Sequence, residues 1–190
     1  MSRIVAKVVI GLALLLVVAG LAWWLLQGQG SRPGQASVPG EVAGPAAEQV
    51  RIPVDLYFPA GDGLRGERRE IQASRAPKDL IRGVVLALLA GPQSAGLARP
   101  LPQGVELGGV GLTADGTAYV DLRWADHDEP PSGGSTAETQ MVYSVVNSVT
   151  QNVPQATRVT LLWNGTQRLT FSGHLDTSRP LLPDPALILR

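Results

Sequence analysis

The sequence predicts a mixed α/β (α+β) domain, a two-layer sandwich of about six short strands and two amphipathic helices in the order β-β-α-β-β-α-β-β. Three observations predict this class. One segment alternates polar and apolar residues as a strand does, two longer segments repeat apolar residues at helical spacing, and Asp-Gly and Asn-Gly pairs separate further short apolar runs. Such elements are typical of layered α/β packing. We assign the domain to residues 50–190, a length that can bury a core without disulfides.

The first predicted elements are two strands joined by a tight turn. Residues 51–58 alternate in polarity, and one face of this strand collects its apolar side chains, which are Ile52, Val54, Leu56 and Phe58. Pro53 has no backbone N–H to donate, so we expect this strand at the edge of a sheet. A turn follows at 60–63, and the charged segment 64–73 is predicted as a second strand or an extended arm.

A helix is expected over residues 77–90. Pro77 suits its first turn. Its apolar residues recur at helical spacing and form one wide face, made of Leu80, Ile81, Val84, Val85, Leu88 and Leu89. Gly91 and Pro92 end the helix, because glycine suits the residue after the last turn and proline cannot continue it.

Two hairpins are predicted from their turns. Strands 105–113 and 117–124 flank an Asp-Gly pair, and strands 157–163 and 166–171 flank an Asn-Gly pair. Both pairs favour the turns that match the twist of antiparallel strands. The proline-containing tail that follows, 172–190, is expected to pack in extended form.

The second helix is expected over residues 135–152, between the two hairpins. Its apolar positions stack four residues apart, at Ala137, Met141, Val145 and Val149. Ser135 and Glu138 have the spacing of a capping box, in which the serine hydroxyl accepts a bond from the third helical amide and the glutamate reaches back to the serine amide. Pro154 lies just beyond the end of this helix.

Residues 1–26 are predicted to be a cytoplasmic N-terminus and a transmembrane signal anchor. The run from Val8 to Leu26 contains no charged residue and as a helix would span about 28 Å, close to the thickness of the hydrocarbon core. Arg3 and Lys7 precede it, so the positive-inside rule keeps the N-terminus in the cytoplasm and sends the domain outward. The alternative is a cleaved signal peptide, for which the run is long and the residues after it make a poor cleavage site.

Residues 27–49 are predicted to be a flexible linker. They are rich in Gly, Pro, Ala and Gln and show no apolar periodicity, so they cannot bury enough surface to order themselves. Together these segments predict a single-pass protein of the cytoplasmic (inner) membrane, with its domain in the periplasm or outside the cell.

The composition excludes several function classes. The 16 basic and 16 acidic residues cancel, which argues against a nucleic-acid-binding protein. No cysteine is present, so disulfides, thiolate metal sites, cysteine nucleophiles and a lipid-modified cysteine are excluded. No cofactor motif is found, and a glycine-rich run, Gly108, Gly109 and Gly111, lies within a predicted strand and indicates a β-bulge rather than a phosphate loop.

Two polar clusters could carry chemistry. The loop Asp126, His127, Asp128 and Glu129 has metal-ligand types, but adjacent loop residues rarely all point at one ion, so we interpret it as solvated. Ser172, His174 and Asp176 alternate on one stretch and could share a face, although sharing a face does not give the geometry of a Ser-His-Asp relay and no nucleophile-elbow motif accompanies them. We therefore favour a structural role for His174.

A locally basic stretch could meet an anionic lipid or cell-wall polymer. It contains Arg65, Arg68, Arg69, Arg75, Lys78 and Arg82. Interspersed acidic residues favour a mixed, solvated face instead.

Seven ordered stretches resemble the sporulation and spore-germination domain family (the GerMN domain). They are VDLYFP at 54–59, LALLAGP at 86–92, LPQG at 101–104, GTAYVDL at 116–122, GGSTAE at 133–138, VNSVT at 146–150 and GHLDTSRPL at 173–181. The family-like positions among them are Gly91, Pro92, Asp121, Gly134, Ser135, Glu138, Asn147, Gly173, His174, Asp176 and Pro180. The resemblance implies a mixed α/β domain outside the cytoplasmic membrane and brings no catalytic residues. The chain carries one copy of this domain and lacks a lipid-attachment cysteine.

We therefore expect a non-catalytic, membrane-anchored module for protein–protein assembly in the cell envelope, related through its family to sporulation or germination. Its partners would be envelope proteins or further copies of itself, bound at sheet edges or at the face opposite the helices. The alternative is a domain that binds cell-wall glycan or peptide through exposed Trp124, Trp163 or Tyr119. An enzyme using His174 or the loop at 126–129 is a third hypothesis. No metal, cofactor or nucleic acid is expected.

Overall fold

The computed structural model describes residues 48–189. The predicted anchor and linker lie outside these residues. The elements in chain order are β1 (Val50–Ala60), β2 (Gly63–Ala73), α2 (Pro77–Leu89), β3 (Val105–Leu112), β4 (Thr117–Trp124), α3 (Ser135–Asn152), β5 (Arg158–Trp163) and the 3-10 helix η1 (Pro185–Leu187). The predicted mixed α/β class with two helices is confirmed. Within the described residues, none of the helices has the length and apolar character needed to cross a membrane.

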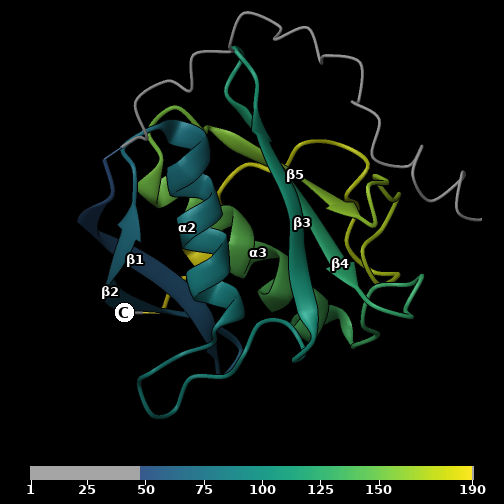
Figure 1. Cartoon of the computed structure of the whole chain (residues 1–190). Helices are drawn as coiled ribbons and strands as arrows, with labels where there is room; N and C mark the ends of the chain where they lie inside the picture. The colour runs from purple at the N-terminus through teal and green to yellow at the C-terminus, as the bar shows by residue number, and fades with distance from the viewer. Residues whose placement is uncertain (1–47, 190) are drawn as a thin grey trace, which may run out of the picture. The chain divides into compact units, whose positions relative to one another are not determined.

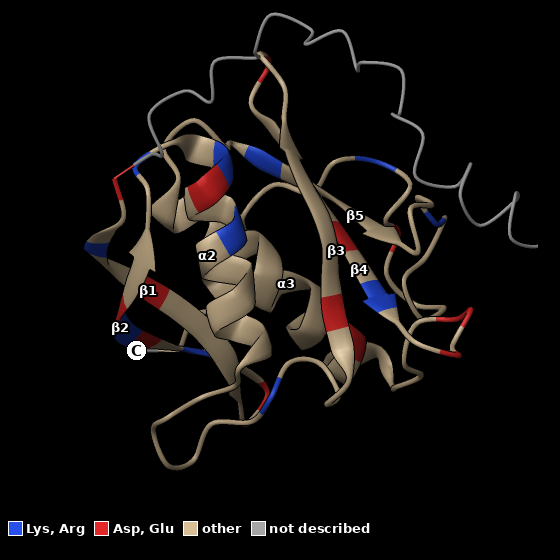
Figure 2. Ribbon diagram, viewed as in Figure 1, with Lys and Arg blue, Asp and Glu red and all other residues tan. Residues whose placement is uncertain are grey.

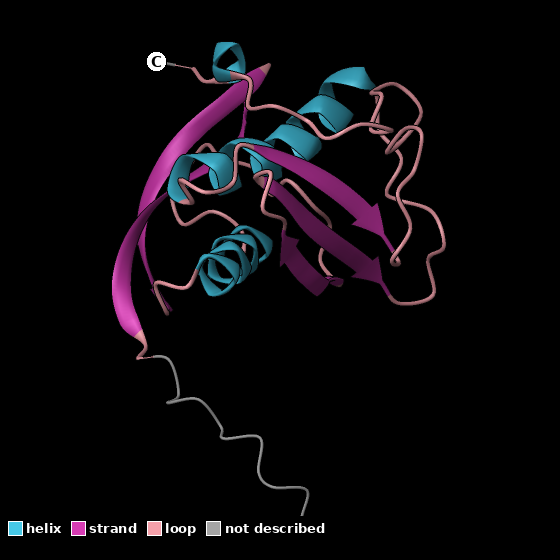
Figure 3. Ribbon diagram, turned by 90° about the horizontal axis from the view of Figure 1, so that it is seen from above, coloured by secondary structure: helices cyan, strands magenta, loops and turns pink. Residues whose placement is uncertain are grey.

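The five strands in the described part of the chain form two sheets. β1 and β2 make an antiparallel hairpin, whereas β4 is central in a second sheet, antiparallel to β3 and parallel to β5. Helices α2 and α3 lie between the hairpin and the three-stranded sheet, as the two perpendicular views show (Figures 1 and 3). Each helix therefore buries its apolar residues against both sheets, and one core serves the whole domain.

The apolar faces predicted from the sequence meet in this core. β1 supplies Val54, Leu56 and Phe58, and α2 supplies the predicted Ile81, Val84, Val85 and Leu88. α3 supplies Met141, Val145 and Val149, but the predicted Ala137 is exposed in its first turn. The largest buried side chain, Trp163 of β5, packs edge-on against Phe171 with ring centroids 5.7 Å apart.

The outer edge of β1 is closed by side chains of α3. The Asn152 amide accepts from the Asp55 amide at 2.9 Å and donates to its carbonyl at 2.8 Å, and Ser148 Oγ accepts from Tyr57 N–H at 2.9 Å. Asn152 thus takes the place of a neighbouring strand at this position. The edge placement expected from Pro53 is confirmed, since no strand among residues 48–189 pairs with β1 on this side.

The end of α2 confirms the stop predicted from Gly91 and Pro92. Gly91 adopts a φ of 85°, in the left-handed region that favours glycine. Two arginine side chains bind the exposed carbonyls of the last turn and its continuation. Arg69 donates to Ala87 O and Gly91 O, and Arg99 donates to Leu89 O and Ala90 O. These bonds satisfy carbonyls that the end of a helix leaves without a partner.

The predicted turns are also confirmed. Asn164 and Gly165 have φ values of 51° and 77°, as a two-residue primed turn requires, and Gly116 has a φ of 84°. The register of β3 and β4 shifts between Leu107 and Gly109, which is the bulge expected at Gly108. A Cβ at Gly108 would overlap the ends of the Asp121 and Arg123 side chains, so a larger residue there would displace their ion pair.

One predicted strand, 166–171, does not form. This segment makes only single bridges, between Trp163 and Thr166 and between Thr170 and Asp176. The position beside β5 is taken by the tail instead, because Leu181 exchanges both backbone hydrogen bonds with Val159 at 2.8 and 2.9 Å. The tail is thus largely extended, as expected, and it supplies the neighbour of β5.

Candidate functional site: the loop face around Glu138

Two loops, 125–134 and 164–176, meet at the start of α3, and we call this surface the loop face. Ser172 Oγ donates to Pro131 O at 2.7 Å, and Arg168 forms an ion pair with Glu129. The Asn164 side chain also donates to His127 O at 3.1 Å. These contacts hold the two loops together although about forty residues separate their sequences.

Glu138 holds the second loop from inside. Its side chain is fully buried in the first turn of α3. The carboxylate accepts from Ser172 N–H at 2.6 Å and His174 N–H at 2.8 Å, and its Oε2 lies 3.0 Å from His174 Nδ1. The predicted capping box is therefore wrong. The N-cap is Gly134, no side chain caps the helix, and Ser135 is exposed, because Glu138 turns inward to the loop rather than back to Ser135.

The environment of Glu138 keeps it charged. Burial by itself raises the pKa of this carboxyl, but the amide hydrogen bonds from Ser172, His174 and Leu175 and the His174 side chain outweigh it and leave the pKa below its usual value. A buried carboxylate that accepts several N–H bonds is a strong anchor for a loop. Gly173, with a φ of 107°, allows the chain to curve around it.

The Ser172, His174 and Asp176 relay is not formed. The Ser172 hydroxyl donates to a backbone carbonyl, and Asp176 accepts from the amide and hydroxyl of Ser178 at 2.9 and 2.6 Å. The histidine is oriented instead by Glu138, which lies 36 residues earlier in the chain. The arrangement provides a carboxylate and an imidazole, with the His174 side chain about half exposed, and among residues 48–189 no hydroxyl is bonded to that ring.

A groove of about 680 Å³ lies beside this cluster. Its lining includes Pro102, Trp124 and the acidic loop, and the rings of Trp124 and His127 stack with centroids 3.8 Å apart. Nowhere in the described part of the chain do three or more His, Cys, Asp or Glu side chains gather in a way that could hold a metal ion. The arrangement can offer an aromatic surface flanked by Asp126, Asp128 and Glu129.

The expected aromatic surface is only partly present. Trp124 lines the groove and Tyr119 is 36% exposed on β4, but Trp163 is 1% exposed and belongs to the core. The groove is also flanked by acidic rather than basic residues. Within the basic stretch, Arg69 is removed from the surface by its bonds to Glu67 and to the end of α2.

Asp121 and Asn147 fix other parts of the chain. Asp121 is 7% exposed and accepts from Gly165 N–H at 2.7 Å, which holds the last turn against β4. The Asn147 amide donates to Asp184 O and accepts from Asp184 N–H, both at 2.9 Å, and so anchors the tail on α3. The expectation that Asn147 bonds backbone is confirmed. Pro180 is exposed.

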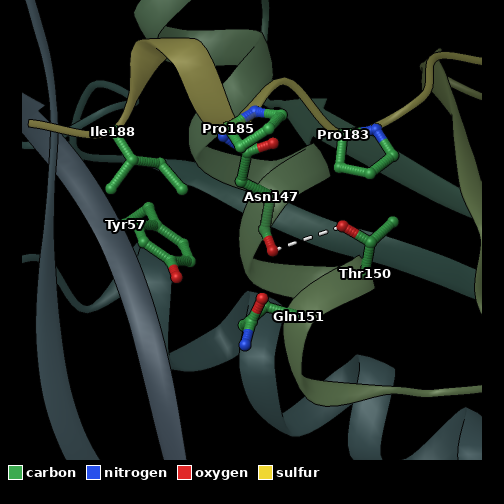
Figure 4. A pocket seen from close by; sticks show the side chains of 7 residues that line it. All are labelled: Tyr57, Asn147, Thr150, Gln151, Pro183, Pro185 and Ile188. Carbon is green, nitrogen blue, oxygen red and sulfur yellow. Dashed lines mark hydrogen bonds between the residues drawn. The ribbon is translucent and has the colours of Figure 1, made fainter.

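Asn147 also borders a cavity of about 200 Å³ between β1, α3 and the tail. Figure 4 shows its lining, made of Tyr57, Asn147, Thr150, Gln151, Pro183, Pro185 and Ile188. Burial, with a contribution from Asp55, raises the pKa of the Tyr57 phenol. The family-like residues thus divide among the loop face, the end of α2, and the contacts that fix the last turn and the tail.

The fold and these contacts define a mixed α/β domain whose buried polar residues mainly hold loops and the tail in place. The family described as sporulation and spore germination matches residues 55–169, which is more than half of the chain. The chain therefore belongs to this family, and the resemblance expected from the sequence is confirmed.

Solved structures share the fold. A candidate lipoprotein from Clostridium perfringens is 23% identical, with a TM-score of 0.51 over 73% of this chain and 93% of that one. The first GerMN domain of the sporulation protein GerM from Bacillus subtilis is 20% identical, with a TM-score of 0.52 over 70% of this chain and 97% of that one. The tandem GerMN domains of GerM are 18% identical, with a TM-score of 0.50 over 70% of this chain and 46% of theirs. No curated protein matches the chain.

Proposed function

We propose that this chain is a non-catalytic assembly module of the cell envelope. In this proposal the run at 8–26 anchors it once in the cytoplasmic membrane, with the N-terminus inside and residues 50–190 in the periplasm or outside the cell. Its membership of the sporulation and spore germination family supports an assembly role related to sporulation or germination. The similarity to a candidate lipoprotein supports a location at the envelope, where a membrane anchor would replace the missing lipid.

The observation that carries this proposal is the use made of the reactive side chains on the loop face. The Glu138 carboxylate accepts hydrogen bonds from two backbone amides and contacts the His174 ring, and the Ser172 hydroxyl donates to Pro131 O. Catalysis needs such groups aimed at a substrate. Here they hold two loops in one arrangement, and a pre-organised surface suits recognition of another protein, because less entropy is lost on binding.

The test is photo-crosslinking in cells with the full-length protein. A photoreactive residue replaces Leu169, which is 79% exposed on the loop face, and the control replaces Ala114, which is exposed at the tip of the β3–β4 hairpin. We expect discrete envelope proteins to be captured at position 169, and the Glu138→Gln variant to reduce this capture at equal protein levels. Recovery of uncrosslinked protein alone, or identical products at both positions, would refute the loop face as the contact surface.

The second candidate function is binding of cell-wall glycan or peptide in the groove beside the loop face. The observation that favours it is the stacked pair of Trp124 and His127 next to carboxylates, since aromatic faces pack on sugar rings and carboxylates attract amines. Purified peptidoglycan should then retain the protein, and Trp124→Ala should abolish retention while Tyr119→Ala leaves it unchanged. Equal retention of all three proteins would exclude this groove.

A further inference from the structure

We propose that the outer edge of β2 pairs antiparallel with the same edge of a second copy of this chain, so that two hairpins form one continuous sheet across a twofold axis. The proposal rests on the assembly role above and names one partner, the chain itself. It uses a different surface from the loop face, so the two proposals can fail separately.

The register of the hairpin identifies which backbone groups of β2 point outward. Leu64 accepts from Leu189 N–H at 2.7 Å on the side away from β1, so its backbone belongs to the outward set. Backbone direction alternates along a strand, which places Gly66, Arg68, Glu70 and Gln72 in the same set. Among residues 48–189, the outward N–H and C=O groups of Gly66, Arg68, Glu70 and Gln72 make no hydrogen bond. The tail contacts β2 at Leu64, so the free edge begins after that residue.

The other strand edges are closed or interrupted. The edge of β1 is bonded by Asn152 and Ser148, and that of β5 by Leu181. The edge strand β3 is interrupted by the bulge at Gly108, a feature that discourages pairing. By contrast, β2 pairs with β1 over eleven residues without a register shift. The outer edge of β2 is therefore regular enough to pair with another strand.

The charges along this edge select one register with a second copy. Arg68 and Glu70 project from the same exposed face of β2, where Figure 2 shows both signs on the hairpin. A twofold axis at Arg69 sets Arg68 opposite Glu70 of the second copy, and Glu70 opposite its Arg68. Axes at Arg68 or Glu70 place like charges directly opposite. Opposite charges stabilise a cross-strand pair and like charges destabilise it, so the edge is complementary to itself in one register.

The residues next to the axis tolerate this arrangement. Arg69 would approach Arg69 of the second copy, but each guanidinium is already paired with Glu67 of its own chain and bonded to the end of α2. At the same edge, Leu86 of α2 is 49% exposed and lines a groove of about 490 Å³ with Gln72 and Ala73. An added strand running beside β2 would pass this apolar surface, which contributes burial to the pairing.

Charge reversal gives a test with a built-in rescue. The purified full-length protein in mild detergent is studied by sedimentation velocity over a concentration series. We expect Arg68→Glu and Glu70→Arg each to weaken dimerisation about tenfold or more, because each reversal creates two repulsive pairs across the twofold axis. The double variant R68E/E70R restores both pairs and should dimerise like the wild type. A mixture of the two single variants should form a heterodimer, since every facing pair is then opposite in charge.

Cysteine crosslinking tests the register directly, because the chain contains no cysteine of its own. In the proposed pairing Gly66 faces Gln72 of the second copy. Copies carrying Gly66→Cys and Gln72→Cys, with different tags, are coexpressed at full length and oxidised in membranes. We expect a disulfide between the two variants and none within either variant alone.

Two results would overturn the proposal. One is a wild-type protein that stays monomeric across the concentration series. The other is a dimer that neither charge reversal weakens, or that gives no disulfide between positions 66 and 72. Neither result affects capture of envelope proteins at position 169, which tests the loop face by itself.

Discussion

Replacing Glu67 with glutamine tests whether a buried ion cluster holds α2 on the hairpin. The Glu67 side chain is 6% exposed and forms an ion pair with Arg69. Its carboxylate also accepts from Gln93 N–H at 2.9 Å and Ser94 N–H at 2.7 Å, in the loop after α2. The same Arg69 binds the carbonyls at the end of the helix. Glu67→Gln therefore removes the charge on which the whole cluster depends.

The size of the effect follows from the pKa of this carboxyl. Burial by itself raises the pKa of Glu67, but the Ser94 and Gln93 amides and Arg69 outweigh it and lower the pKa from 4.5 to about 2. Each pKa unit is worth about 1.4 kcal/mol, so the ionised form stabilises the fold by about 3 kcal/mol. This stabilisation is complete above pH 4.5 and is lost as the pH falls toward 2. The variant should lose about the same free energy of unfolding at neutral pH.

The free energy of unfolding of both proteins is measured by urea unfolding followed by circular dichroism, at pH 7 and at steps down to pH 2. The wild type should exceed Glu67→Gln by about 3 kcal/mol at pH 7, and the difference should shrink between pH 4.5 and 2. Glu106→Gln is the matched control, because this glutamate is exposed on β3 and its side chain makes no ion pair or hydrogen bond within residues 48–189, so the change should alter the free energy of unfolding by less than about 0.5 kcal/mol. A Glu67→Gln variant as stable as the control, or a gap that stays constant to pH 2, would refute the reasoning.

Three further substitutions test other contacts, each by urea unfolding or limited proteolysis. Glu138→Gln should lower the free energy of unfolding by about 2–4 kcal/mol, since buried N–H groups lose a charged acceptor. It should also speed proteolytic cleavage of the loop after residue 171, and unchanged cleavage would contradict the anchoring role of Glu138. Gly91→Ala should cost about 1–2 kcal/mol, because a φ of 85° strains alanine and its Cβ would lie 2.8 Å from Arg99 Cζ, and no loss would show that the turn relaxes freely. Asn147→Ala should release the tail at Asp184 to a carboxypeptidase with a loss of about 1–2 kcal/mol, and an equally resistant tail would show that other contacts hold it.

Local chemistry made much of the fold predictable from the sequence. The pairs Asp115-Gly116 and Asn164-Gly165 encode their turns in their own backbone preferences, and Pro77 and Gly91 mark the two ends of α2. These signals depend on neighbours within a few residues, so no knowledge of the tertiary structure is needed to interpret them.

The candidate site depended on contacts between distant segments, which local patterns do not encode. Glu138 has the spacing of a capping residue, yet three donors from residues 172–174 compete for its carboxylate and win once the loop packs over α3. The segment 166–171 has the pattern of a strand, but in the folded chain Leu181 occupies the edge of β5 at Val159. An acidic residue in the first turn of the helix was the signal that the sequence offered for the Glu138 cluster. Its burial, which the structure shows, distinguishes it from a capping residue.

The closure of β1 by α3 also affects the order in which the chain can fold. The bonds between Asp55 and Asn152 span 97 residues, and a two-stranded hairpin is at best marginally stable by itself. Helix α2 can pack on the hairpin early, but the outer edge of β1 gains these bonds only after most of the domain has been made, and contacts of such long sequence separation slow folding. For a chain that crosses a membrane with the N-terminal end of this domain leading, as proposed here, the outer edge of β1 stays without these bonds until α3 has crossed as well.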